Sequence, residues 1–179
     1  YNCDTAEQKK FWQENLDGFD SPVEFSQRRC KAKDIKGINR FGEYHLTWST
    51  VFKEELENFV TSHRITLATL LYSARAVLSR KYNYCNDVAF GVTVAGRSAK
   101  IEGIENIVGL FINTLPLMLS FIAGETIACL LNRCHEQSRA MESYEYTPLP
   151  EIKEYALPDR QEELFNTIMV LENYPLDQT

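Results

Sequence analysis

Hydrophobic positions along the chain repeat with two periods, and these periods divide it into helices and strands. A spacing of three to four residues recurs over 4–17, 52–63, 66–82 and 125–143, which predicts four helices. Alternation of apolar and polar residues, or short apolar runs bounded by turn residues, predicts strands at 44–49, 87–95, 108–119 and 167–171. The mixture favours an α/β fold in which a mixed sheet is flanked by helices.

The segment 66–95 combines a helix with a strand of unequal faces. The helix is apolar almost all round, so we expect it to be buried on several sides, with Thr66 as its N-cap. In the strand 87–95 the bulky residues fall on one face, while Ala89, Gly91 and Thr93 fall on the other. A face of small side chains lets a helix backbone or a ligand approach the strand closely.

The run VGLFINTLPLML at 108–119 is the most apolar stretch, yet it contains an amide side chain. A buried polar group costs roughly 1–3 kcal/mol unless it is paired. Asn113 is therefore expected either to fix a neighbouring loop or to line a ligand path. Pro116 cannot donate to a strand ladder, which predicts a bulge or an edge strand here.

Composition narrows the class of protein. The chain has 179 residues, a net charge of -6 and 44% hydrophobic residues, enough for a sizeable core. The charge disfavours a nucleic-acid surface, and no apolar run is long enough to cross a membrane. Five irregularly spaced cysteines without a CxxC pair predict reduced thiols in the cytoplasm and no metal site. The absent initiator Met suggests an excised piece of a larger protein.

No catalytic motif is present among the titratable residues. The three histidines, at 45, 63 and 135, are scattered along the sequence. No HExxH or GxSxG motif occurs, and no glycine-rich nucleotide-binding fingerprint with its third glycine is present. Arg97, directly after the strand 87–95, is either a solvated loop residue or an anchor beside a substrate channel. Thr93 and Thr114 can each offer a hydroxyl to a pantetheine-like amide, or they can simply pack beside the core.

Four ordered motifs then carry a resemblance to a known family. They are NDVAFGVTVAGR (86–97), IENIVGLFINTLPLML (104–119), YEYTPLPEI (144–152) and LFNTIMVLENYPLD (164–177). In this order they resemble the condensation domain of nonribosomal peptide synthetases, and the resemblance covers nearly the whole chain. The Asn-Thr-Leu-Pro stretch resembles peptide-bond-forming members more than epimerization or heterocyclization relatives. The family often has Arg where this chain has Met118.

The resemblance implies a chloramphenicol-acetyltransferase-like fold of two lobes with a tunnel between them. Donor and acceptor peptidyl carrier proteins reach this tunnel with phosphopantetheine arms from opposite ends. The family's His-His-x-x-x-Asp-Gly motif belongs to the N-terminal lobe and does not occur here, so this chain alone is expected to be inactive, with no catalytic residue and no bound cofactor. Its tunnel-flanking residues would be Gly91, Thr93, Arg97, Asn113 and Thr114.

These observations define the hypotheses to be tested. Residues 1–24 are interpreted as a helix and linker that arrive from a missing N-terminal lobe, and residues 25–179 as the C-terminal lobe of a condensation domain. One alternative is a non-catalytic module that binds carrier proteins through a basic patch, formed by Arg28, Arg29, Lys31 and Lys33. A third possibility is half of a free-standing acyltransferase that uses coenzyme A.

Overall fold

A mixed sheet organises the molecule. The structure, a computed structural model, describes residues 5–22, 42–96, 106–158 and 162–172. The element order is α1 (Thr5–Asn15), α2 (Thr50–Ser62), α3 (Leu67–Asn83), β1 (Asp87–Val94), β2 (Asn113–Ser120), α4 (Ile127–Met141), the 3₁₀ turn η2 (Glu142–Tyr144), α5 (Leu149–Ala156) and β3 (Ile168–Met169). The strands lie in the order β2-β1-β3, with β1 antiparallel to β2 and parallel to β3. The predicted α/β class is confirmed.

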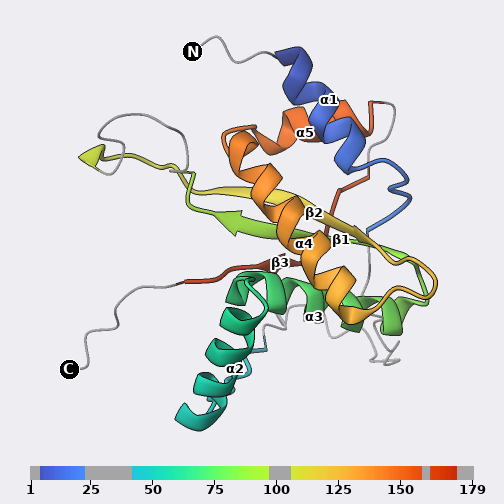
Figure 1. The fold of residues 1–179 in the computed structure, drawn as a ribbon. Helices are drawn as coiled ribbons and strands as arrows, with labels where there is room; N and C mark the ends of the chain where they lie inside the picture. Colours follow the sequence, from blue (N-terminus) through green and yellow to red (C-terminus); the bar gives the residue numbers. More distant parts are fainter. Residues whose placement is uncertain (1–4, 23–41, 97–105, 159–161, 173–179) are drawn as a thin grey trace, which may run out of the picture.

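Helices α3 and α4 pack together on one face of this sheet (Figure 1). Phe90 of β1 packs against Tyr72 of α3, with ring centroids 6.2 Å apart. Because side chains alternate along a strand, Val88 and Val92 share this face with Phe90, as do the β2 residues opposite them. These bulky side chains are buried in one hydrophobic core, which confirms the unequal faces expected for β1.

Helix α1 belongs to the same core. It lies beside α5 in Figure 1, and its Trp12 is fully buried among the core residues of the sheet. The boundary expected at residues 24 and 25 lies outside the described residues, and the origin of α1 in a separate lobe stays a prediction. What the structure shows is that α1 and the sheet are packed as one unit.

Strand β2 lies at an edge of the sheet, as Pro116 predicted. The Gly91 N–H donates to the Thr167 carbonyl on the β3 side, so the Gly91–Pro116 pair exchanges no ladder hydrogen bonds, and proline costs the ladder nothing. Side chains also cap the outer edge of β2. Gln137 donates to the Met118 carbonyl at 2.8 Å, and Arg133 donates to the Ser120 carbonyl. Such capping protects an edge strand from pairing with another chain.

Three strand predictions are wrong in part or in whole. Residues 44–49 have no regular secondary structure and belong to no strand of the described chain, and Tyr44, Leu46 and Trp48 are exposed. Alternation alone does not make a strand, because a strand needs a hydrogen-bonding neighbour. The run 108–119 is strand only from Asn113 onward, since residues 108–112 are irregular. The last strand shortens to Ile168–Met169.

The helix predictions hold, but the burial expected for α3 is wrong. Thr66 caps α3 by accepting the Thr69 N–H, as predicted. Its buried stripe, however, consists of small and polar residues together with Tyr72, whereas Leu67 and Leu78 are exposed. Helix α2 contacts α3 and projects away from the sheet in Figure 1, and none of its residues is buried. Both helices therefore present apolar side chains that no described residue covers.

Candidate functional site

Strand register brings three of the expected site residues onto one face of the sheet. Thr93 of β1 lies directly opposite Thr114 of β2, and Gly91 is two residues from Thr93 on the same face. This face is the one turned away from Phe90 and the helices. Both threonines are half-buried, and neither hydroxyl makes a hydrogen bond within the described parts of the chain. Two hydroxyls therefore stand side by side on the small face.

The group packed against Gly91 is an aromatic ring and not a backbone segment. A Cβ added at Gly91 would lie 2.6 Å from Cε2 of Phe165, a contact that real side chains essentially never make. Phe165 thus covers the centre of the small face. The expectation of a close approach is confirmed, and the approaching group is a side chain that the sequence pattern did not identify.

A hollow of ≈ 450 Å³ lies at the C-terminal end of β1. Its wall combines the end of β1 (93–95), the segment before β2 (109–112) and the segment after β3 (170–172). Gly96 holds two of these segments together: its φ is +66°, and a Cβ there would collide with the Phe111 carbonyl. Thr93 lines this hollow, and Thr114 lies opposite Thr93 on β2.

Asn113 lies on the opposite, helix-covered face. Its Nδ2 donates to the carbonyls of Glu145 and Thr147, each at 2.8 Å, and its Oδ1 accepts the Thr114 N–H at 2.9 Å. The amide thus ties the start of β2 to the turn between η2 and α5. These hydrogen bonds fit the interpretation in which Asn113 fixes a neighbouring loop. Asn113 precedes Thr114 in β2, and the two side chains lie on opposite faces of the sheet.

The same turn anchors a polar cluster that the sequence did not reveal. The Thr147 hydroxyl accepts hydrogen bonds from Gln8 Nε2 at 2.6 Å and from Trp12 Nε1 at 3.0 Å. Thr147 and Trp12 are fully buried and Gln8 is 4% exposed. The i, i+4 spacing of Gln8 and Trp12 was the only available signal, because it places both on one face of α1. Helix α1 is thereby linked through residues 145–147 to Asn113.

The remaining sequence predictions concern the basic residues, the cysteines, and metal or membrane sites. Arg97 and the basic residues at 28–33 lie outside the described residues. The described cysteines Cys85, Cys129 and Cys134 are free thiols, and burial raises the pKa of the Cys134 thiol. The described residues hold no group of metal-ligating side chains, and no helix among them has the length and apolarity needed to span a membrane.

Comparison with known proteins decides the family. The family model described as "Condensation domain" matches residues 2–179. The chain belongs to the condensation domain family. A linear gramicidin synthase from Brevibacillus parabrevis is 36% identical over 96% of this chain. A surfactin synthase from Bacillus subtilis (strain 168) is 33% identical over 98% of it. The chain spans 2% and 5% of the lengths of these two relatives.

Solved structures of other proteins share the fold. A holo four-domain nonribosomal peptide synthetase bound to AMP and glycine superposes with a TM-score of 0.72 at 23% identity, over 96% of this chain and 13% of that one. The X-domain from teicoplanin biosynthesis gives a TM-score of 0.74 at 22% identity, over 94% of this chain and 37% of that one. The fold is thus the condensation-domain fold that the four motifs indicated.

Proposed function

We propose that this chain is the C-terminal lobe of a condensation domain that joins two carrier-tethered aminoacyl or peptidyl thioesters through an amide bond. The observation that carries the proposal is the family match over residues 2–179, together with a small sheet face that bears two hydroxyls beside a hollow. The named relatives are synthases of gramicidin and surfactin, which supports a biosynthetic reaction of this class. The three cysteines among the described residues are free thiols, which supports a reducing, cytoplasmic location.

In this reaction the acceptor amine attacks the donor thioester carbonyl. A C–N bond forms and the C–S bond breaks. The proton lost by the amine is taken up by the departing thiolate, which leaves as a thiol. The histidine that the family resemblance assigns to this step lies in the N-terminal lobe, so this chain contributes no catalytic residue. Its contribution is to hold the tethered reactants in line, an effect that accounts for a large part of such rate enhancements.

The tunnel wall assigned to this chain runs along the small face of the sheet. The hydroxyls of Thr93 and Thr114 would donate hydrogen bonds to the amide carbonyls of a phosphopantetheine arm. Gly91 and Phe165 would form the wall of the tunnel beneath that arm. Asn113 is a positioning residue in this proposal, because its bonds to the 145–147 turn hold the start of β2 and hence Thr114. Arg97 is assigned to the same path from its place in the sequence alone.

The remainder of the domain would cover the exposed apolar surfaces of this lobe. A helix with no buried residue, such as α2, gains little from its present contacts, and helical stability in proteins comes mainly from packing. Exposed apolar residues also gather on 107–112, where Val108 and Leu110 are fully or almost fully exposed. Contiguous apolar surface of this kind is typical of an interface. We assign it to the N-terminal lobe of the same domain.

The threonine pair provides the decisive experiment. Thr93→Val with Thr114→Val removes both hydroxyls but keeps the side-chain volume. A neutral hydrogen bond contributes about 0.5–1.5 kcal/mol, so loss of two should lower kcat/KM for peptide formation about tenfold in the intact synthetase. Thr61→Val is the matched control, because its exposed hydroxyl bonds only within α2.

A second variant separates positioning from contact. Asn113→Ala keeps both threonines in the sequence but frees the 145–147 turn, so it should lower peptide formation by disordering Thr114. Turnover that is unchanged in the threonine double variant, with folding intact, would refute the proposed path. Unchanged turnover and folding in Asn113→Ala would refute only the positioning role.

A further inference from the structure

Strand β3 is very short, yet the segments on either side of it form part of the proposed tunnel wall. Phe165, which covers Gly91, comes before the strand. Residues 170–172, which wall the hollow beside Thr93, come after it. Ile168, the first residue of β3, is 56% exposed. A short edge strand with exposed side chains opens easily, so the position of this wall depends on what else holds β3.

Thr167, directly before β3, is held from two sides. Its backbone carbonyl accepts the Gly91 N–H at 2.9 Å, which joins it to β1. Its side-chain hydroxyl accepts a hydrogen bond from the guanidinium of Arg75 at 2.8 Å, which joins it to α3. Figure 1 shows α3 running beside β3. Because Phe165 lies only two residues before Thr167, a bond that fixes Thr167 also limits where the Phe165 ring can move.

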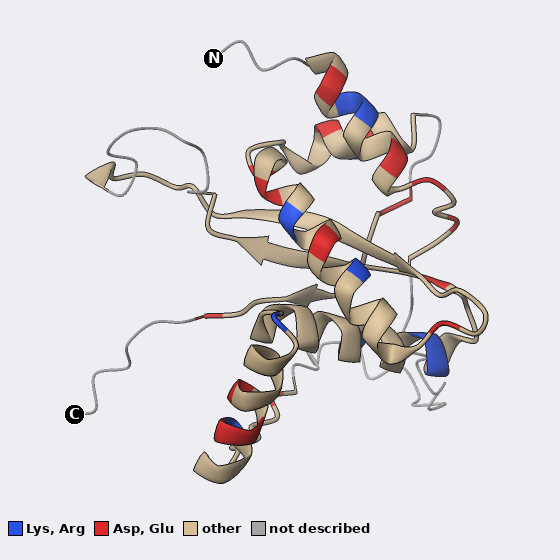
Figure 2. Cartoon of the chain, viewed as in Figure 1, with Lys and Arg blue, Asp and Glu red and all other residues tan. Residues whose placement is uncertain are grey.

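The bond from Arg75 to Thr167 joins a charged donor to a neutral acceptor. Neither β2 nor β3 contains a charged residue (Figure 2). Arg75 is half-buried, and burial lowers the pKa of its guanidinium. A guanidinium drawn away from water is costly unless its N–H groups find acceptors, and a bond from a charged donor is roughly twice as strong as a neutral one. The contact with Thr167 is therefore a strong anchor for β3.

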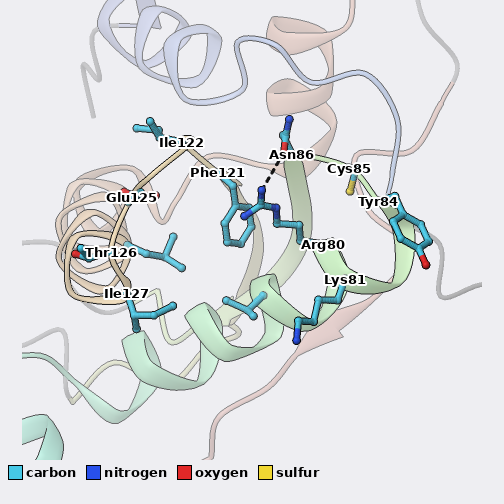
Figure 3. A pocket seen from close by; sticks show the side chains of 12 residues that line it. Arg80, Lys81, Tyr84, Cys85, Asn86, Phe121, Ile122, Glu125, Thr126 and Ile127 are labelled. Carbon is cyan, nitrogen blue, oxygen red and sulfur yellow. Dashed lines mark hydrogen bonds between the residues drawn. The ribbon is translucent and has the colours of Figure 1, made fainter.

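The other arginine of α3 contacts a different part of the sheet. Arg80 lies five residues after Arg75, so its side chain points about 140° away around the helix axis. Figure 3 shows Arg80 over the Phe121 ring, 4.6 Å from the ring centroid, and beside Asn86, which accepts its hydrogen bond at 3.4 Å. Asn86 precedes β1 and Phe121 follows β2, so these contacts lie at the opposite end of the β1–β2 pair from Thr93. Arg80 therefore does not supply the contact that Arg75 makes beside β3.

From these contacts we infer that Arg75 is a positioning residue that clamps β3 onto β1 through its hydrogen bond to Thr167. The clamp keeps the Phe165 ring over Gly91 and so fixes the wall beneath the phosphopantetheine arm. The inference rests on the proposed function for the reaction that this wall serves. Arg75 acts through Thr167 and Phe165 and not on the reacting atoms. Without the clamp the tethered reactants are held less well in line, which lowers kcat.

Two variants remove the bond from its two ends in the intact synthetase. Arg75→Met removes the donor and keeps a long unbranched side chain, and Thr167→Val removes the acceptor and keeps the side-chain volume. Each should raise the hydrogen-exchange rate of the Gly91 amide about tenfold, measured by mass spectrometry with residue-resolved fragmentation. The amides of Phe90 and Val92 should exchange as in the wild type, because they bond toward β2 and not toward β3.

The same variants should lower kcat for peptide formation about five- to tenfold and leave the KM for the carrier proteins unchanged. The double variant should be no slower than either single variant, because both remove the same bond. Thr167→Ser keeps a hydroxyl at this position and should recover most of the lost kcat. Arg139→Met is the matched control, since Arg139 is an exposed arginine in the last turn of α4, and it should change neither the exchange rate nor kcat.

The outcomes separate this inference from the proposed function. Exchange of the Gly91 amide at the wild-type rate in both variants would overturn the clamp. Equally faster exchange at Phe90, Gly91 and Val92 would assign Arg75 to general stability, and faster exchange at Gly91 with unchanged kcat would show that the clamp positions nothing. Either result would also overturn the inference. If the wild-type synthetase forms no amide, the proposed function fails, and exchange at Gly91 still decides whether Arg75 clamps β3.

Discussion

The hydroxyl of Thr147 is predicted to contribute strongly to the stability of this chain. It accepts two hydrogen bonds, from Gln8 Nε2 and Trp12 Nε1, and all three residues are buried. Its substitution by valine keeps the shape of the side chain and replaces the hydroxyl with a methyl group. No cavity is formed, so the effect isolates the two hydrogen bonds.

The magnitude follows from the donors that remain. A buried donor without an acceptor costs about 1–3 kcal/mol, because its hydration was lost on folding and nothing replaces it. Thr147→Val leaves two such donors, one amide and one indole N–H. We therefore expect the free energy of unfolding to fall by about 2–6 kcal/mol, a large part of the 5–15 kcal/mol typical of a domain. Relaxation of the Gln8 side chain toward solvent would give values near the lower limit.

Urea unfolding monitored by tryptophan fluorescence measures this change as a shift of the midpoint at constant slope. Thr61→Val is the control, because its hydroxyl is exposed, and it should change the free energy of unfolding by less than about 0.5 kcal/mol. Gln8→Leu combined with Thr147→Val should cost less than the sum of the single variants, since the pair shares one hydrogen bond. A loss for Thr147→Val no larger than that of the control would refute the argument.

Two further predictions concern the sheet and its edge. Gly91→Ala should lower stability by about 1–3 kcal/mol through collision with Phe165, and Phe165→Leu should restore part of it, whereas Gly42→Ala, with open space around it, should be neutral in the same urea assay. The hydrogen bond from Arg133 lowers the pKa of the Glu125 carboxyl, so the stability it contributes is present above the ordinary glutamate range and is lost as the pH falls below about 4. Unfolding midpoints between pH 7 and pH 3 should therefore fall more steeply for the wild type than for Glu125→Gln, and equal slopes would contradict this assignment.

Local features of the fold were predictable from the sequence, because they depend on neighbours along the chain. The N-cap at Thr66 and the small face of β1 follow from spacing and residue type, and both are confirmed. Pro116 predicted a bulge or an edge strand, since a missing N–H restricts where a strand can lie, and β2 lies at an edge. Residues 44–49 show the limit of this reasoning. Their alternation is as regular as that of any strand, but pairing requires a neighbour that sequence spacing does not supply.

The candidate site shows the same division between local pattern and long-range contact. Thr93 and Thr114 were both recognisable as polar residues in apolar strands, but only the register places them opposite each other. A shift of one residue would have put Asn113 on the small face and Thr114 among the helices. The bonds from Asn113 to residues 145 and 147 help to prevent that shift, because they require its side chain on the helix-covered face. The amide that stood out as a candidate ligand group is thus best explained as the residue that fixes which face of β2 the threonine occupies.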